Sequence, residues 1–244
     1  MRVTVLGIWG AYPEAASCTS SFLLAEGKYN LLLECGSGVL SQLQRHLPLA
    51  QLDAVLLSHY HHDHIADVRC LQYATLVQMQ LKNRRNPLPI YGHAQDKKAF
   101  SSLHYGTWTQ GFAIREGKIH HIGPWQVSFC ATTHTVPCLA ARLEASGKAI
   151  VYTADTEWRE PLVEFAHGAD LIICEASLYR EQQGHVKGHL TGRQAGELAA
   201  RAKAKRLLLT HLPHFGDHNR LLQEAMEVFN GNVQLAAADL ELDV

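Results

Sequence analysis

The sequence has several absences that exclude whole classes of protein. It contains no apolar run that approaches the roughly 18 residues of a membrane-spanning helix. The first residues, Met1 to Leu6, enter a strand pattern directly, without the apolar core and cleavage site of a secretory leader. We therefore expect a globular cytoplasmic protein with no membrane partner.

Neither an excess of one charge nor a paired-cysteine motif is present. The chain has 22 Lys and Arg against 23 Asp and Glu, which leaves a formal charge of −1. This balance provides no general attraction to nucleic acid or to a membrane surface. The six cysteines contain no Cys-x-x-Cys pair, so we expect reduced, buried thiols that pack as small apolar side chains. A large nucleic-acid partner and catalysis by cysteine are therefore not expected.

The remaining composition is that of an ordinary globular protein, with 47% hydrophobic and 18% charged residues. No segment has the composition of a linker, so we predict one domain over residues 1–244. Alternating and apolar runs predict strands in both halves, at residues 3–7, 20–25, 29–34, 54–57, 88–93, 125–130, 140–144, 148–153, 169–174, 206–210 and 233–236. Helical spacing is found at residues 39–46, 65–82, 94–103, 191–204 and 221–229. This mixture predicts an α/β (α+β) fold with two packed sheets and helices outside.

Histidine is abundant, at 16 residues, and it is concentrated after the apolar run 54–57. The segment 58–64 reads Ser-His-Tyr-His-His-Asp-His. Neutral imidazole and carboxylate are the ligands that suit zinc and similar ions. His59 and His61 alternate and therefore point the same way on an extended segment, whereas Asp63 and His64 follow at a predicted strand-to-helix turn. The segment thus offers two ligands to one metal ion and two to another, with His62 pointing away.

Other predicted strands also end at residues that can bind a metal or support catalysis, namely His134, Asp155, Glu175 and His211. We predict that His59, His61 and His134 form one site, that Asp63, His64 and His211 form a second, and that Asp155 bridges the two. Two divalent ions held in this way share a hydroxide and clamp both oxygens of a displacement. We expect zinc, with manganese or iron as the alternatives.

These residues match the metallo-β-lactamase superfamily in order and identity, over nearly the whole chain. The resemblance implies a four-layer αββα sandwich with the metal ions at one edge of the two sheets. A carboxylate at Asp155 resembles the dinuclear hydrolases of the superfamily, whereas the true β-lactamases commonly have cysteine there. Hydrolysis of β-lactam antibiotics is therefore disfavoured.

Three further segments resemble segments of ribonuclease Z. Residues 174–177, Cys-Glu-Ala-Ser, resemble its His-Glu-Ala-Thr segment, and residues 188–191, Gly-His-Leu-Thr, resemble its His-Ser-Thr segment. Residues 33–38 resemble its Asp-Cys-Gly-Glu-Gly loop, with Glu34 in place of Asp. The resemblance implies that His189 protonates the leaving oxygen and that Glu175 supports His189 or a metal ligand. His189 also precedes a predicted helix start, where an anionic phosphate is favoured.

The leading hypothesis from the sequence is a phosphodiesterase of the ribonuclease-Z-like type that uses a metal-bridging hydroxide, which Asp63 orients or deprotonates. No Gly/Pro-rich basic insertion, such as the tRNA-binding arm of ribonuclease Z, lies between His64 and His134. A small-molecule or short nucleotide phosphodiester is therefore the expected substrate class. The alternatives are a lactone or thioester hydrolase on the same metal site and an iron-containing redox module, which would need a flavin partner. A homodimer is implied by the resemblance alone.

Overall fold

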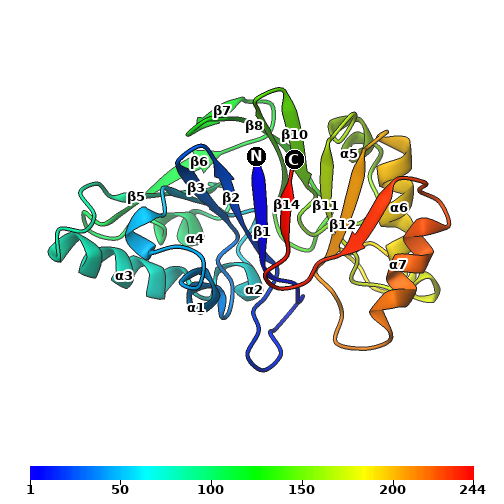
Figure 1. Ribbon diagram of the computed structural model, residues 1–244, viewed down its shortest axis with the longest axis horizontal. Helices are drawn as coiled ribbons and strands as arrows, with labels where there is room; N and C mark the ends of the chain where they lie inside the picture. The colour runs from blue at the N-terminus through cyan, green and yellow to red at the C-terminus, as the bar shows by residue number, and fades with distance from the viewer. The chain divides into compact units, whose positions relative to one another are not determined.

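The computed structural model describes residues 1–244, which fold into two compact units with one seven-stranded sheet each (Figure 1). The first unit comprises Met1–Arg115, Ile122–Pro124 and Ala237–Asp243, and the second comprises Glu116–His121, Trp125–Ala236 and Val244. Both units mix strands with helices, so the expected α/β class is confirmed. None of the helices is both long and apolar enough to cross a membrane.

The sheet of the first unit has the strand order β14-β1-β2-β3-β4-β5-β6. Its strands are β1 (Arg2–Gly7), β2 (Ser21–Glu26), β3 (Tyr29–Leu33), β4 (Ala54–Leu56), β5 (Leu88–His93), β6 (Thr109–Ile114) and β14 (Glu241–Asp243). Strands β14, β1, β2 and β3 pair antiparallel, whereas β3 to β6 pair parallel. Strands β1, β3 and β4 therefore end at the same edge of the sheet. The loop 8–20, Glu34 and the histidine segment all begin at this edge.

The helices of the first unit differ from the predicted ones in length and in their buried face. They are α1 (Val39–Leu43), η1 (Leu49–Gln51), α2 (His62–Ile65), α3 (Val68–Gln80) and α4 (Lys97–Ser101). The helix predicted from residue 65 starts earlier, at His62, and is divided into α2 and α3. On α3 the buried residues include the apolar Val68 and Leu71 and also the polar Gln72, whereas Leu76 is only partly buried. Burial of Gln72 is tolerated because its side-chain amide donates to the carbonyl oxygens of residues 102 and 103.

The sheet of the second unit has the order β13-β12-β11-β10-β9-β8-β7. Its strands are β7 (His120–Ile122), β8 (Trp125–Ala131), β9 (Leu139–Ala145), β10 (Lys148–Tyr152), β11 (Leu171–Glu175), β12 (Arg206–Thr210) and β13 (Asn232–Leu235). Strand β9 pairs antiparallel with both β8 and β10, and β10 to β13 are parallel. Strands β8, β10, β11 and β12 therefore run in one direction. Their carboxyl ends lead to His134, Asp155, Glu175 and His211 at one edge of this sheet.

The helical elements of the second unit are α5 (Glu160–Phe165), η2 (Arg180–Gln182), α6 (Gly192–Arg201) and α7 (His218–Met226). Helices α6 and α7 pack on each other, and glycine residues of α6 lie at their contact. Thr191 is the N-cap of α6, as predicted, and forms a capping box with Gln194. A Cβ atom at Gly196 would lie 2.4 Å from the carbonyl oxygen of Ala225 on α7. Glycine therefore lets α7 approach α6 closely, and α6 fixes the segment that precedes Thr191.

Candidate metal centre

The first cluster of candidate ligands lies in the loop between β4 and α2 and in α2 itself. The Nε2 atom of His59 is 3.1 Å from Nδ1 of His61, and the rings of His59 and His64 have their centroids 4.1 Å apart. The Nε2 atom of His64 is 3.5 Å from Oδ2 of Asp63. The structure thus gathers the four residues singled out in the sequence segment, while His62 is exposed.

The histidines of this cluster are held by buried neighbours. The hydroxyl of Ser58 is 2.9 Å from Nδ1 of His59. Glu34, which is fully buried, accepts a hydrogen bond from the backbone N–H of Ser58 through Oε1 and places Oε2 3.6 Å from Nδ1 of His64. A hydrogen bond such as that of Ser58 can orient a metal-binding imidazole, whereas Glu34, at 3.6 Å, adjoins His64 without a hydrogen bond to it. Glu34 was identified only as a substitution in the glycine loop, so its place beside His64 is a finding of the structure.

Asp63 is positioned by the loop that follows β1 and by the loop that follows β3. The backbone N–H of Ala11 donates to Oδ2 of Asp63 over 2.9 Å, and the hydroxyl of Thr19 donates to the carbonyl oxygen of Asp63 over 2.6 Å. A Cβ atom at Gly36 would lie 1.6 Å from that same carbonyl oxygen. Glycine at this position is therefore explained by the close approach of the backbone that carries Asp63.

The second cluster lies at the carboxyl edge of the other sheet and centres on Asp155. Oδ2 of Asp155 is 3.3 Å from Nε2 of His211 and 3.8 Å from Nε2 of His134. One carboxylate oxygen thus faces two imidazoles. The backbone makes a sharp turn at both strand ends, because Ala154 and His211 adopt positive φ angles of 52° and 54°. Such conformations cost free energy for residues other than glycine and are concentrated at functional sites.

His189 and Glu175 form a pair beside Asp155 and His211. The Nδ1 atom of His189 is 3.2 Å from each carboxylate oxygen of Glu175. The His189 ring is stacked on that of His211, with centroids 5.4 Å apart and an interplanar angle of 21°. Atoms of Asp155, His189 and His211 that can bind a metal lie within 4.8 Å of one another. His189, to which the resemblance assigns protonation of the leaving oxygen, and Glu175, expected to support it or a metal ligand, therefore adjoin two of the predicted metal ligands.

The segment before His189 is tied to His134. The Nδ1 atom of His134 is 2.9 Å from the carbonyl oxygen of Gly188, which leaves Nε2 facing Asp155. Gly188 has φ +86°, and a Cβ atom there would lie 2.6 Å from Nδ1 of His134. Its N–H donates to Glu157 over 2.8 Å. Neither Glu157 nor the contact of Gly188 with His134 was predicted, because both link positions far apart in the sequence.

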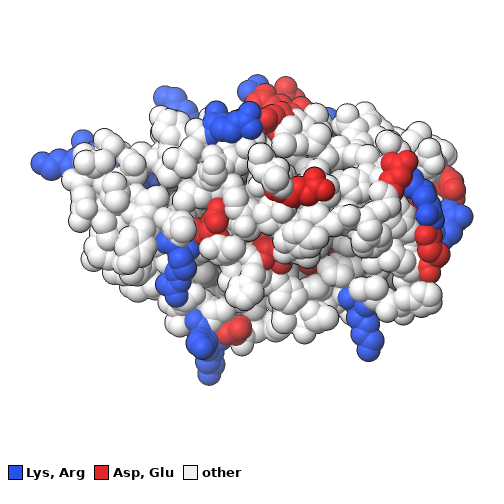
Figure 2. All heavy atoms as spheres, turned by 90° about the horizontal axis from the view of Figure 1, so that it is seen from below, with Lys and Arg blue, Asp and Glu red and all other residues white.

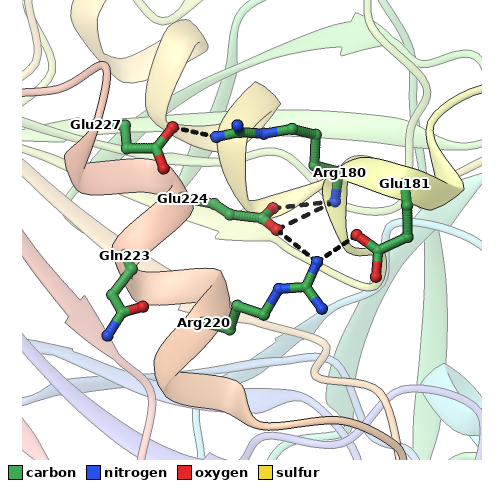
Figure 3. Close-up of a pocket in the computed structure, with 6 residues that line it drawn as sticks. All are labelled: Arg180, Glu181, Arg220, Gln223, Glu224 and Glu227. Atoms are coloured by element: carbon green, nitrogen blue, oxygen red, sulfur yellow. Dashed lines mark hydrogen bonds and ion pairs between the residues drawn. The ribbon is translucent and has the colours of Figure 1, made fainter.

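A pocket with six lining residues adjoins the start of this same segment, between η2 and α7 (Figure 3). Its charged groups are paired with each other: Arg180 with Glu227, and Arg220 with Glu181 and Glu224. Glu224 also accepts from the backbone N–H of Arg180. These contacts fasten η2 to α7. We therefore assign this pocket a structural role.

The donor atoms of both clusters suit a borderline divalent ion. Two nitrogens on one tetrahedral zinc lie roughly 3.4 Å apart, given Zn–N bonds of about 2.0–2.1 Å. The 3.1 Å between His59 and His61 is close to this separation. Cys35 and Cys174, which follow Glu34 and precede Glu175, are buried, and burial raises the pKa of both thiols.

Comparison with known proteins identifies the family. The family model described as a beta-lactamase superfamily domain matches residues 29–212. The probable metallo-hydrolase YhfI of Bacillus subtilis is 45% identical over 236 residues, which cover 97% of each chain. The crystal structure of the metallo-beta-lactamase fold protein YhfI from this organism matches with a TM-score of 0.94 and 43% identity, over 99% of this chain and 98% of that one.

More distant similarity extends to ribonuclease Z. The enzyme of Haloferax volcanii is 25% identical over 308 residues, covering 100% of this chain and 95% of its own. The crystal structure of the short form of human tRNase Z matches with a TM-score of 0.77 at 21% identity, over 100% of this chain and 99% of that one, which shows a shared fold. The predicted αββα fold class is therefore confirmed. This chain belongs to the metallo-β-lactamase superfamily.

Proposed function

We propose that this protein is a metal-dependent hydrolase that binds two divalent ions, with zinc as the expected ion, and that its substrates are phosphodiesters. The hydrolase assignment is supported by the similarity to the probable metallo-hydrolase YhfI and by the donor set of the two clusters. The observation that carries the choice of phosphodiesters is the Glu175–His189 pair, whose His189 ring stacks on His211. A carboxylate-supported imidazole at this place can donate a proton to a leaving alkoxide.

In this proposal the predicted ligands bind two divalent ions. His59, His61 and His134 would hold one ion, Asp63, His64 and His211 would hold the other, and Asp155 would serve as a ligand to both. The support for Asp155 as the bridge is that its Oδ2 atom faces both His134 and His211. When bound, such ions supply Lewis acidity that activates water and neutralises charge on phosphate oxygens.

The protein groups divide the proton transfers between them. Asp63, whose Oδ2 atom accepts from the Ala11 amide, orients the attacking water and takes its proton. In this proposal Glu175 accepts from Nδ1 of His189, and the proton that the ring donates is carried on Nε2. That proton passes to the leaving oxygen. Asp63, His189 and Glu175 are therefore the proposed catalytic groups.

A small or short-chain substrate is supported by the charge distribution. On the face drawn in Figure 2, Lys and Arg side chains are dispersed and interspersed with Asp and Glu. Arg84, one of the few paired arginines in the sequence, donates to the carbonyl oxygens of residues 50, 52 and 86. Its guanidinium therefore forms hydrogen bonds with the backbone of the protein itself. The Lys and Arg side chains on this face and Arg84 therefore do not form the continuous cationic surface that a long nucleic acid requires.

The test is a turnover screen on the metal-reconstituted protein, with metal content measured on the same sample. Substrates are bis(p-nitrophenyl) phosphate, cyclic nucleotides, a short RNA and an acyl-lactone. We expect turnover of phosphodiesters and little or none of the lactone. Preferential turnover of the lactone would replace the proposal with the acyl-hydrolase alternative, and an iron content with a redox-active absorption spectrum would favour the redox module.

A further inference from the structure

Ser177 lies two residues after Glu175 and contacts residues that follow two neighbouring parallel strands. Its Oγ atom is 2.7 Å from Oε2 of Glu175 at the end of β11. The same Oγ atom is 2.8 Å from Nδ1 and 3.0 Å from the carbonyl oxygen of His211, which follows β12. One small hydroxyl therefore touches both a proposed proton-relay residue and a proposed metal ligand.

The direction of each hydrogen bond follows from a count of protons. An ionised carboxylate only accepts, and a serine hydroxyl has a single proton to donate. The shorter and charge-assisted contact is with Glu175, so the Ser177 proton lies there. Nδ1 of His211 must then donate to Ser177. In the neutral ring, Nε2 of His211, 3.3 Å from Asp155, is then the unprotonated nitrogen and is available to a metal.

The carboxylate of Glu175 is held at two points besides His189. The Thr156 amide donates to Oε1 over 2.7 Å, and Ser177 donates to Oε2. These two contacts fix the plane in which both oxygens lie 3.2 Å from Nδ1 of His189. Without the Ser177 hydroxyl, the carboxylate is held at Oε1 and is able to rotate away from His189.

We propose that Ser177 is a positioning residue that fixes the Nδ1–H tautomer of His211 and, through Glu175, the orientation of His189. The chain of contacts runs from His211 through Ser177 to Glu175, and from His189 to the same carboxylate. This inference rests on the proposed function, in which His211 binds metal and His189 donates a proton. Ser177 thereby couples metal binding to leaving-group protonation.

The first experiment measures the tautomer and the metal affinity. In the metal-free protein, long-range ¹H–¹⁵N spectra of the histidine rings are expected to show the Nδ1–H tautomer of His211 in the wild type and in Ser177→Thr, and a loss of that preference in Ser177→Ala. Chelator competition should show zinc affinity about 10–100-fold weaker in Ser177→Ala, with Ser177→Thr close to wild type, since removal of such supporting contacts has effects of this size. Ser101→Ala, which removes an exposed hydroxyl bonded to the carbonyl of Lys98, is the matched control.

The second experiment measures turnover at saturating metal with two classes of leaving group. An alkoxide leaving group requires protonation, whereas p-nitrophenolate departs without it. We expect Ser177→Ala to lower kcat about 10-fold for an alkyl phosphodiester, with KM and the p-nitrophenyl rate little changed, and the effect to vanish in a His189→Ala background.

An unchanged His211 tautomer together with unchanged zinc affinity in Ser177→Ala would overturn the inference. A changed tautomer and weakened zinc binding in a protein that turns over none of the substrates would uphold the positioning of His211 and reject the proposed phosphodiesterase function. The two failures are therefore distinguishable. Near-ultraviolet circular dichroism and the unfolding midpoint of each variant verify that the comparison is made between folded proteins.

Discussion

At the scale of single residues, both candidate clusters lie next to strained backbone. Glu34, Ala154 and His211 have positive φ angles of 65°, 52° and 54° although none is glycine. A non-glycine residue in this conformation costs roughly 1–2 kcal/mol. All three follow strands that end at a candidate ligand edge, so the strain turns the chain abruptly there. The sharp turn is what holds the following side chain at the sheet edge.

This strain predicts the effect of glycine at Ala154. Ala154→Gly should raise the free energy of unfolding by about 0.5–1 kcal/mol or leave it unchanged, because glycine adopts the left-handed conformation without steric cost. Ala149→Gly, on the preceding strand β10 and also buried, should lower it by roughly 1 kcal/mol. Urea unfolding of the two variants measures both. Equal destabilisation by the two substitutions would show that the conformation at Ala154 is not strained.

A second prediction concerns His189. His189→Ala should lower turnover of a phosphodiester about 10²–10⁴-fold while the bound metal stays at the wild-type level, because the variant loses the proton donor and keeps every proposed ligand. His185→Ala, in the same segment but exposed, is the matched control and should retain wild-type turnover. Steady-state kinetics with metal analysis on the same sample tests this. Equal turnover of the His189 variant and wild type would remove His189 from the mechanism.

The candidate ligands could be predicted from the sequence because they are clustered or because each follows an apolar run. His59, His61, Asp63 and His64 occur within six residues, and such a density of imidazole and carboxylate is typical of a metal site. Their supporting groups could not be predicted in the same way. Ser177 and Glu157 act through contacts with residues that the fold, and not the local sequence, brings near. The structure was therefore needed to find the groups that orient the ligands.

At the scale of elements, prediction succeeded where the chain carries strong local signals. The strand pairs β2–β3 and β9–β10 were predicted from apolar runs on either side of Gly27 and Gly147, and both glycines adopt positive φ angles in the turns. Helix α6 was predicted because Thr191 caps it. The edge strands β7 and β14 were missed because each has only three residues, and the edge strand β6 was missed because its six residues, Thr109–Ile114, show no regular apolar alternation. Helix α5 was missed as well, because its six residues are too few for a periodic pattern.

The parallel strands β10, β11 and β12 are joined near their starts by an ion cluster. Asp170, directly before β11, accepts from Lys205 over 2.8 Å, from Lys148 over 3.2 Å and from the Ala149 amide over 2.9 Å. Burial by itself raises the pKa of Asp170, but these hydrogen bonds outweigh it and lower the pKa from 3.8 to about 2. The hydrogen bonds of the folded protein thus stabilise the ionised form of the Asp170 side chain. Its stabilising contribution is complete above the unfolded-state pKa and is lost as the pH falls towards about 2.

Asp170→Asn should remove that part of the pH dependence. We expect the variant to be less stable than wild type by about 1 kcal/mol at neutral pH, since it loses the charge but keeps an oxygen for the Ala149 amide. The difference should shrink as the pH falls from 3.8 towards 2, where the wild-type carboxylate becomes protonated. Unfolding free energies measured over this range provide the test. A constant difference between the two proteins at all pH values would contradict the assignment.

At the scale of the whole molecule, the two units repeat one plan. In each sheet antiparallel pairing gives way to parallel pairing, and the candidate ligands follow strands that run in one direction. The match to YhfI over 99% of the chain agrees with this plan. A single domain over residues 1–244 and a homodimer remain predictions. The mass of the native protein in solution tests the second of these.

The molecule as a whole also buries nearly all of its thiols. Burial raises the pKa of Cys18 to about 12 and that of Cys130 to about 11, and it raises the pKa of Cys35 and Cys174 as well. Cys70 is the exception to the predicted burial, because it lies on the solvent side of α3. At neutral pH a thiol reagent should therefore modify one thiol of the native protein rapidly and all six after denaturation. Rapid reaction of a second native thiol, located by peptide mass spectrometry, would contradict this expectation.

The contact between Gly188 and His134 has a consequence for inhibition. A compound that displaced residues 185–189 would withdraw the Gly188 carbonyl oxygen, which contacts Nδ1 of His134, and would move His189 at the same time. If His134 binds a metal ion as proposed, such a compound would weaken metal binding without carrying any chelating group. Its potency would fall as free zinc is added, although the compound itself has no affinity for zinc.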